Sequence, residues 1–434
     1  MFSKNALTSI EFQSSEEIKE YQNQKLQEQL KYLVTYSKFY QDLFEKHQID
    51  LKSIQSIEDL VKIPVTSKND LQQFNSDFLC VLPTEIIDYS TTSGTLGDPV
   101  TFGLTDKDLD RLATNEMNSF QRIGVQKGDV VQLMTTIDRR FMAGLAYFLG
   151  LRKIGAGVIR VGAGVPQLQW DSILKYQPKY LVAVPSFLLK MIDYAEKNNI
   201  DYQNSSVKAV LCIGESLRDK ELNPSLLTQK INSKWDVQLF STYASTEMGT
   251  AFTECEVGVG GHHQPDLIIT EILDENNEVV EDGELGELTI TTLGIEGMPL
   301  LRFKTGDLLR KHSDKCKCGS NSYRLGPVEG RKQHMIKYKG TTLYPPALHD
   351  ILNHFDEIKL HLIEIYSNEF GTDEILIRLV STDETDVFLA KIKDYFRAKL
   401  RVTPSIKFET FEELQPIVFK PESRKPITFI DYRE

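Results

Sequence analysis

Residues 89–99 read Tyr-Ser-Thr-Thr-Ser-Gly-Thr-Leu-Gly-Asp-Pro, with hydroxyl side chains and glycines concentrated between Thr91 and Gly97. Hydroxyls and unhindered backbone amides suit a loop that wraps phosphate oxygens, because glycine lets the backbone approach closely. The stretch is not a Walker A loop, since no Gly-Lys-Ser or Gly-Lys-Thr follows it. On composition alone, an ordinary surface loop rich in serine, threonine and glycine is the alternative.

Downstream of this loop the chain alternates between β-rich runs and helical stretches. Helical spacing is found between the runs, for example at 186–197, and strands are expected at 130–134, 157–161, 180–184, 207–213 and 237–241. Such alternation predicts crossover connections and a mostly parallel sheet. After Thr246 two strand runs, 266–273 and 287–293, follow each other without a helix. They indicate a β-rich subdomain at about 250–330.

The two ends of the chain carry their own patterns. Ser14 and Glu17 fit a capping box before a helix with apolar residues spaced up to Leu33. From residue 331 onward we expect a helix at 345–355, strands at 360–366 and 374–380, a helix at 387–400 and a strand at 406–411. The predicted fold class is therefore α/β, with a large multi-part N-terminal body over 1–330 and a small, mobile α+β lid over 331–434.

Composition excludes some functions. The chain has 434 residues, 41% of them hydrophobic, and a net charge of -12, which argues against nucleic acid or an anionic membrane as the main partner. The most apolar stretch, 141–151, is too short to span a bilayer, and residues 1–12 lack the apolar core of a signal peptide. Five cysteines in so long a chain do not suggest a disulfide framework. We expect a cytoplasmic enzyme.

Further stretches suited to nucleotide chemistry follow the 89–99 loop in chain order. They are Ile213-Gly-Glu-Ser216, Tyr243-Ala-Ser-Thr-Glu247, Arg302-Phe-Lys-Thr-Gly-Asp307, Gly330-Arg331 and Lys425. In this order the motifs resemble those of the adenylate-forming superfamily (acyl-CoA synthetases, adenylation domains and luciferases), and most closely the phenylacetate-CoA ligase family. The resemblance runs from about residue 88 to residue 425.

The resemblance implies a role for each motif. It places Glu247 as a catalytic magnesium ligand, Asp307 on the ribose hydroxyls and Lys425 as the catalytic cation. Arg331 opens the stretch that resembles the interdomain hinge and is also counted among the nucleotide-binding residues. The resemblance assigns the binding of the adenine and phosphates of ATP or AMP to Thr91, Thr92, Ser93, Gly94, Thr95, Gly97, Gly214, Glu215, Ser216, Tyr243 and Thr246.

These roles agree with the chemistry of carboxylate activation. Attack on the α-phosphate of ATP expels pyrophosphate, and the charge that develops calls for a magnesium ion and a movable cation. Each residue also has a plain structural alternative. Glu247 could be a carboxylate at a helix start, Asp307 an ordinary turn residue, and Lys425 a solvated lysine near the end of the chain.

The resemblance also places a substrate pocket and shows departures from the family pattern. Phe141 and Gly144 fall where relatives line the acyl pocket, although the start of a core helix is the alternative. Asp98 stands where the superfamily commonly has lysine, Gln333 stands where many relatives have an acidic hinge residue, and Ala244 replaces a usual glycine. These differences keep open a catalytically silent paralogue that binds a nucleotide or an acyl ligand.

A second constellation consists of cysteines and histidines. Cys316-Lys-Cys318-Gly319 resembles a zinc knuckle, and Cys255 with one histidine would complete a tetrahedral structural site. The resemblance to the family pattern favours His262 over His263. Free thiols and surface histidines are the alternative. Cys80 and Cys212 are expected to be small buried hydrophobic residues.

The predicted function is that of an ATP-dependent acid–thiol ligase. It would convert a small carboxylic acid, such as phenylacetate or another aryl or acyl acid, into acyl-AMP with release of pyrophosphate, and then into the coenzyme A thioester. Transfer to a carrier protein or another acceptor is the nearer alternative, and the silent paralogue the more distant one. ATP, Mg²⁺, coenzyme A and a structural Zn²⁺ are the expected cofactors, and a homodimer is the expected assembly. The identity of the acid is open, because pocket shape depends on residues distant in sequence.

Overall fold

The computed structural model describes residues 9–92, 100–338, 341–368, 373–420 and 426–433. The chain divides into two compact units, one formed by residues 1–305 and 309–327 and the other by residues 306–308 and 328–434. Among the described residues, no helix is both long and apolar enough to cross a membrane.

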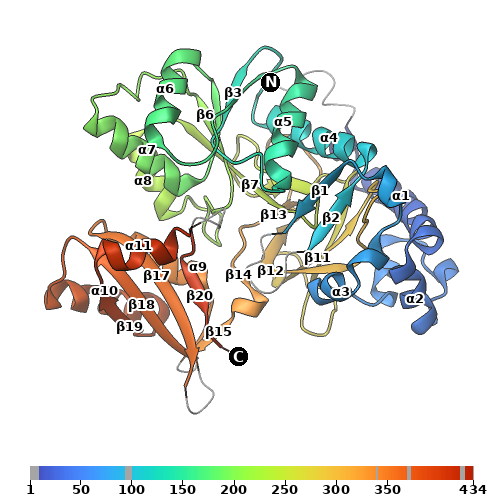
Figure 1. The fold of residues 1–434 in the computed structure, drawn as a ribbon. Coiled ribbons are helices and arrows are strands. Elements are labelled where there is room, and N and C mark those ends of the chain that lie inside the picture. Colours follow the sequence, from blue (N-terminus) through green and yellow to red (C-terminus); the bar gives the residue numbers. More distant parts are fainter. Residues whose placement is uncertain (1–8, 93–99, 339–340, 369–372, 421–425, 434) are drawn as a thin grey trace. The chain divides into compact units, whose positions relative to one another are not determined.

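A parallel sheet forms the centre of the first unit (Figure 1). Its strands are ordered β4-β3-β5-β6-β7, and every neighbouring pair runs parallel. The predicted strands are all present, with ends that differ from the expected ones by one to four residues or not at all: β3 (Val130–Leu133), β4 (Gly157–Arg160), β5 (Tyr180–Ala183), β6 (Ala209–Cys212) and β7 (Gln238–Ser245). The α/β class is therefore confirmed.

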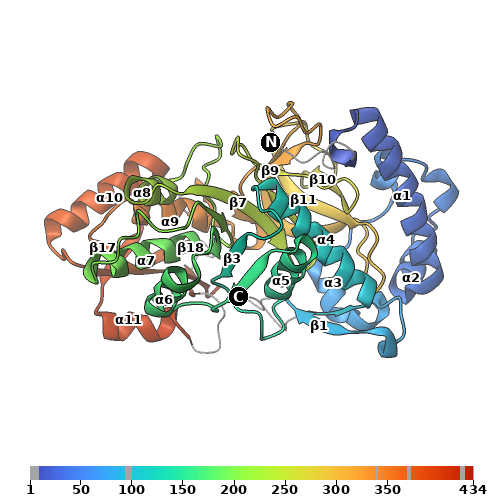
Figure 2. The same cartoon turned by 90° about the horizontal axis from the view of Figure 1, so that it is seen from above.

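Helices cover both faces of this sheet (Figures 1 and 2). Leu181 and Val210 point to a core that contains Trp170 and Trp235 from the α6–α8 side. Their neighbours Val182 and Leu211, one position along each strand, join the opposite core with α4 and α5. Side chains alternate between faces in a strand, so continuously apolar strands are what a sheet buried on both sides requires. The helices are α4 (Asp106–Arg122), α5 (Met142–Ile154), α6 (Pro166–Tyr176), α7 (Pro185–Lys197) and α8 (Leu226–Lys234).

Beyond β7 the connections change from crossovers to antiparallel pairing. β7 pairs antiparallel with β8, and β10 with β11, with no helix between β10 and β11, as the sequence predicts. The strands of this region are β8 (Thr250–Thr253), β9 (Gly261–His262), β10 (Ile268–Leu273), β11 (Leu285–Thr292), β12 (Phe303–His312), β13 (Arg324–Leu325) and β14 (Gly330–Arg331).

The N-terminal part consists of helices and one hairpin. The predicted capping box is present, because Ser14 Oγ accepts from the backbone of Glu17, and the Glu17 side chain accepts from the backbone of Ser14. The helices are α1 (Ser15–Tyr36), α2 (Lys38–Lys46) and α3 (Lys68–Gln73). They precede an antiparallel hairpin of β1 (Asp88–Thr91) and β2 (Thr101–Leu104).

The second unit has a four-stranded sheet, ordered β19-β18-β17-β20, with helices on both faces. The predicted strand at 406–411 is wrong at its end: β19 stops at Phe408, and Phe411 begins α11, which Thr410 caps. A serine or threonine followed three residues later by glutamate favours a helix start. The elements are β15 (Ile336–Tyr338), β16 (Thr341–Leu343), α9 (Pro345–Asn353), β17 (Ile358–Ser367), β18 (Asp373–Ser381), α10 (Asp386–Leu400), β19 (Ser405–Phe408), α11 (Phe411–Val418) and β20 (Phe429–Asp431).

The contact between α4 and α5 contains a buried acid, Glu116. A Cβ atom on Gly150 would lie 2.5 Å from the Glu116 Cβ, which shows how closely the two helices approach. Burial raises the pKa of Glu116 from 4.5 to about 8, and the Asn115 amide donates a hydrogen bond of 3.0 Å to its carboxyl group. Between pH 4.5 and 8 the folded protein therefore retains on Glu116 a proton that the unfolded chain has already released.

This retained proton makes stability fall as pH rises through that window. Glu116→Gln cannot ionise, so we expect it to exceed the wild type in stability by about 4 kcal/mol at pH 8 and to differ little at pH 4.5. Thermal unfolding of both proteins from pH 4.5 to 8 measures the difference. Exposed Glu16→Gln is the control and should show no such trend. A difference between Glu116→Gln and wild type that does not vary with pH would contradict the assignment.

Candidate active site and metal cluster

The carboxyl edge of the parallel sheet collects most of the predicted site residues of the first unit. Because β3, β5, β6 and β7 run parallel, the segments that follow them meet at one edge: 134–141, 184–186, 213–218 and 246–249. In open α/β sheets this edge is where ligands bind. The start of the 89–99 stretch is attached to the same edge, since Thr91 N donates to the Arg140 carbonyl at 3.0 Å.

The predicted phosphate loop follows β1 in the chain and precedes β2. Thr92 and Val100 close its base, because Thr92 N donates to the Val100 carbonyl at 3.0 Å and Val100 N donates to Thr92 Oγ1 at 3.1 Å. Thr91 and Thr92 are both buried. Five predicted residues of this loop lie outside the described residues: Ser93, Gly94, Thr95, Gly97 and Asp98.

The 213–216 turn leaves β6 and is exposed from Gly214 to Ser216. Gly214 has φ +77°, a left-handed conformation that glycine adopts without strain. The Glu215 carboxylate accepts from both the backbone N and the Oγ of Ser186, each at 2.8 Å. Ser186 lies in the first turn of α7, so Glu215 caps that helix and fixes the shape of the turn.

Glu247 lies in the turn between β7 and β8. This excludes the helix-start alternative, because the two flanking strands pair antiparallel, with Ser245 opposite Thr250. Its neighbour Thr246 is half-buried like Glu247 itself, and Tyr243 is half-buried in β7. Within the described part of the chain, no residue donates a hydrogen bond to the Glu247 carboxylate. A half-buried carboxylate in that state fits a metal ligand, since Mg²⁺ prefers oxygen donors.

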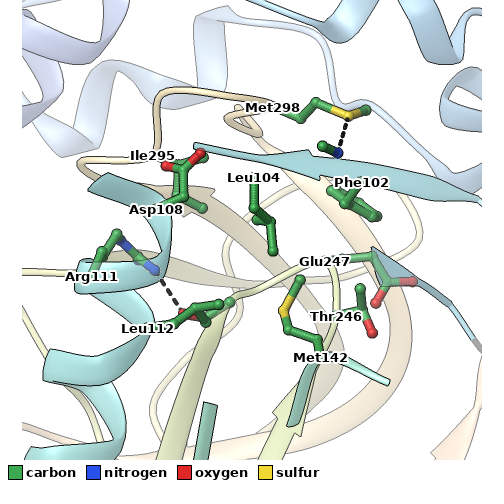
Figure 3. A pocket seen from close by; sticks show the side chains of 12 residues that line it. Phe102, Leu104, Asp108, Arg111, Leu112, Met142, Thr246, Glu247, Ile295 and Met298 are labelled. Carbon is green, nitrogen blue, oxygen red and sulfur yellow. Dashed lines mark hydrogen bonds between the residues drawn. The ribbon is translucent and has the colours of Figure 1, made fainter. Parts of the chain in front are cut away.

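A mainly apolar pocket lies beside this turn (Figure 3). Figure 3 shows Glu247 and Thr246 near Met142, with Leu104 and Phe102 on the strand above. The walls come from β2, α4, the first residue of α5, the 246–249 turn and the segment after β11. They are Phe102, Gly103, Leu104, Asp108, Arg111, Leu112, Met142, Thr246, Glu247, Gly249, Ile295 and Met298.

Arg111 is a site residue that the sequence analysis missed. Its guanidinium is buried and donates to the backbone carbonyls of Gly249 at 2.6 Å, Leu293 at 2.7 Å and Leu267 at 2.6 Å. It thereby holds the turn that carries Glu247 against the pocket walls. An arginine in a charged helix resembles a solvated residue in the sequence, and nothing in its spacing signals these partners.

Phe141 and Gly144 lie at the start of α5. Phe141 is the N-cap residue and is half-buried. A Cβ atom on Gly144 would lie 2.0 Å from the Thr136 carbonyl oxygen, so glycine there lets the helix pack against the segment after β3. The next residue after Phe141, Met142, lines the pocket.

The second unit holds Asp307 and Arg331. They are paired residues of β12 and β14, and Arg331 Nε donates to Asp307 Oδ1 at 2.9 Å. Asp307 is buried, while the Arg331 side chain is 47% exposed. Gln333 lies in a short helical turn that follows. Lys425 falls outside the described residues.

The predicted metal cluster assembles from two segments that are distant in sequence, 255–262 and 316–318. The Cys/His cluster comprises Cys255, His262, Cys316 and Cys318, whose potential ligand atoms all lie within 4.8 Å of one another. His263 faces elsewhere: its Nε2 lies 2.6 Å from the Ile268 carbonyl, and its ring stacks on Tyr323. His262 is therefore the histidine that the structure brings to the thiols.

Two distances within the Cys/His cluster match those of a tetrahedral zinc site. Zn–S bonds of about 2.3 Å and a Zn–N bond of about 2.0 Å place two sulfurs about 3.8 Å apart, and sulfur and nitrogen about 3.5 Å apart. Cys255 Sγ lies 3.7 Å from Cys316 Sγ, and Cys318 Sγ lies 3.5 Å from His262 Nε2. Three thiols and one imidazole are also a donor set that zinc commonly takes. The residues present fit the ion.

The fold and the site define an adenylate-forming enzyme, and the chain belongs to the family of AMP-binding enzymes, which it matches over residues 23–296. The chain is 25% identical over 417 residues to a phenylacetate-coenzyme A ligase of Thermus thermophilus, covering 89% of this chain and 92% of that protein. It is 26% identical over 368 residues to the Pseudomonas putida enzyme of the same name, covering 83% and 82%.

Among solved structures, a 2-hydroxyisobutyryl-CoA ligase in the postadenylation state, in complex with R3-HIB-AMP, shares the fold. The TM-score is 0.84 at 22% identity, covering 97% of this chain and 91% of that chain. At this identity the likeness establishes the fold alone.

Proposed function

We propose that the protein activates a small carboxylic acid with ATP and transfers the acyl group to coenzyme A. One observation carries the proposal: the base of the phosphate loop, the 213–216 turn and the Glu247 turn all lie at the carboxyl edge of one sheet. Membership of the AMP-binding family and the names of the curated relatives support the same reaction class.

In the first half-reaction a carboxylate oxygen of the acid attacks the α-phosphorus of ATP. A P–O bond forms to the acid, the bond to the bridging oxygen of the β-phosphate breaks, and pyrophosphate leaves. Glu247 would hold Mg²⁺, which neutralises charge on the phosphates when bound. Lys425 would balance the charge that develops as the oxygen attacks.

In the second half-reaction a thiolate attacks the acyl carbonyl carbon of the adenylate and expels AMP. We propose that the second unit acts as a lid that moves about the Arg331–Gln333 region between the two half-reactions. Such exchange would withdraw Lys425 and admit the thiol, so that one site performs two reactions in turn.

Phenylacetate or a related aryl acid is the proposed substrate class. The phenylacetate-CoA ligases among the relatives motivate it, and the apolar walls beside Glu247, such as Leu104 and Met142, favour an apolar acyl group over a charged one. The full reaction tests the proposal, with ATP, phenylacetate and either coenzyme A or a phosphopantetheinylated carrier protein. Mass spectrometry of AMP and of the acylated thiol then identifies the acceptor. Formation of AMP and phenylacetyl-CoA would support the proposal. Formation of acylated carrier protein without acyl-CoA would show that the carrier, and not coenzyme A, is the acceptor.

A catalytically silent paralogue is the second candidate. Asp98 and Gln333 depart from the family pattern and motivate it. The surroundings of Glu247 favour an enzyme over a silent paralogue. Its carboxylate is half-buried and accepts no hydrogen bond from the described residues, so no structural role accounts for its burial.

We further propose that the Cys/His cluster holds one structural zinc ion. Four protein ligands leave no open position for substrate, so such a site stabilises the fold and does not take part in the reaction. Its place between β8, β9 and the 316–319 segment would tie the β-rich region together.

About one zinc per chain is expected by elemental analysis of the purified protein. Cys316→Ser should lose most of the metal and unfold at a temperature lower by about 5 °C or more, because one thiolate ligand is gone. Cys80 lies outside the cluster, and Cys80→Ser should keep the metal. Full zinc content in Cys316→Ser would remove Cys316 from the ligand set.

We also propose a cytoplasmic location and a homodimer. None of the five cysteines, all of which the structure describes, forms a disulfide, and this suits a reducing compartment. Light scattering on the purified protein measures the assembly directly.

A further inference from the structure

A buried ion pair joins the 213–216 turn to the segment that carries the metal ligands. Arg218 Nε donates to Glu254 Oε1 at 3.0 Å, and Arg218 Nη2 donates to Oε2 at 3.1 Å. The side chains of Arg218 and Glu254 are 15% and 1% exposed. A two-pronged pair of this kind fixes orientation as well as distance, which a lysine could not do.

Glu254 is bound from two further sides. Its carboxylate also accepts from the backbone N of Ser241 at 3.1 Å and of Gly260 at 3.3 Å. Ser241 belongs to β7, two residues before Tyr243, and Gly260 lies two residues before His262. Glu254 itself directly precedes Cys255. A single carboxylate thus connects the strand of the proposed adenine site with the loop of the Cys/His cluster.

The 255–262 loop, which carries Cys255 and His262, also covers the guanidinium of Arg218. Gly258 has φ +67°, and a Cβ atom there would lie 2.3 Å from Arg218 Nη2. Any displacement of the 255–262 loop would therefore remove a packing surface from Arg218 and the Gly260 hydrogen bond from Glu254.

Arg218 in turn holds the exposed turn. Its backbone N donates to Ser216 Oγ at 3.2 Å, and Ser216 Oγ donates to the Arg218 carbonyl at 2.8 Å. Ser216 is thereby fixed by the residue whose side chain reaches Glu254. The chain of contacts runs without interruption from the Cys/His cluster to the turn proposed to bind adenine.

We propose that Arg218 and Glu254 are positioning residues through which metal occupancy of the Cys/His cluster sets the affinity of the site for the nucleotide. This rests on the proposed function for the adenine site and on the proposed zinc. Metal in the cluster orders the 255–262 loop, the loop orders Glu254 and Arg218, and Arg218 orders the 213–216 turn. Loss of the metal weakens ATP binding without touching the residues proposed to bind the acid.

If the coupling exists, the effects of metal removal and of Arg218→Ala on ATP affinity should not add. We expect removal of the metal with a chelator to weaken ATP binding about tenfold by titration calorimetry, and Arg218→Ala to do the same. Arg218→Ala after chelation should be no weaker than either alone, since both break the same chain of contacts. Lys220→Ala, an exposed residue of the same loop, is the control and should bind ATP like the wild type.

Two readouts separate positioning from a general loss of structure. Hydrogen exchange at 213–218 should quicken in the chelated protein while exchange in the core strands of the sheet is unchanged. In zinc-loaded Arg218→Lys, which retains the charge, the KM for ATP should rise about fivefold with kcat and the KM for the acid unchanged. If chelation unfolds the whole unit, the KM for ATP of zinc-loaded Arg218→Lys alone tests the coupling.

The possible failures differ. If the zinc-loaded wild type binds no ATP, both the proposed function and the coupling are wrong. If the wild type binds ATP, the coupling alone is wrong when Arg218→Lys keeps the wild-type KM for ATP. It is likewise wrong when the folded chelated protein keeps wild-type affinity, or when chelation and Arg218→Ala weaken binding by factors that multiply.

Discussion

Lys425→Ala is expected to lower acid-dependent ATP–pyrophosphate exchange by about a hundredfold to a thousandfold, while ATP still binds. Removing one group that stabilises developing charge in a transition state typically costs this much. The cation acts on the charge that builds as the carboxylate attacks, so the loss should fall on kcat more than on the KM for ATP.

A nearby lysine provides the matched control. Lys420 is exposed and lies five residues earlier, so Lys420→Ala should retain full exchange. Equal losses in both variants would indicate a general electrostatic effect of the C-terminal segment. Full exchange in Lys425→Ala would remove the lysine from the mechanism.

Glu247→Gln should have the second-largest effect, a loss of about a hundredfold in exchange, together with a higher magnesium requirement. The amide retains the size of the side chain but removes the charge that would hold Mg²⁺ beside the phosphates. Titration of exchange activity against magnesium concentration measures both changes.

Exposed Glu278→Gln, in the connection between β10 and β11, is the control for a lost negative charge outside the 246–249 turn. An unchanged magnesium titration in Glu247→Gln would show that Glu247 is no ligand. The helix-start alternative for Glu247 is already excluded by the antiparallel β7–β8 connection, so a purely capping role cannot account for a loss.

Features encoded locally could be predicted from the sequence. The five parallel strands are predictable because β-rich runs alternate with helical stretches along the chain. Leu181 and Val182 point to opposite cores, which is why such a strand is apolar throughout. The capping box at Ser14 and the Cys316-Lys-Cys318 part of the Cys/His cluster are likewise short patterns.

Features that depend on distant contacts could not be predicted. Arg111 reads as one more charge on a polar helix, and its buried contacts with three backbone carbonyls come from segments more than a hundred residues away. The pairing of Arg218 with Glu254 spans 36 positions and leaves no periodic signal. In the second unit a strand was extended to Phe411 because apolar residues continue, whereas the cap at Thr410 had already begun a helix.

We propose that the site at the carboxyl edge of the sheet catalyses the formation of acyl-adenylates. ATP–pyrophosphate exchange with magnesium, measured across aryl, short-chain and long-chain acids, tests it most directly. Exchange should depend on one class of acid, with phenylacetate or a related aryl acid the most active, and should be lost in Lys425→Ala. ATP binding without exchange for any acid would contradict it, and would indicate a silent nucleotide-binding paralogue.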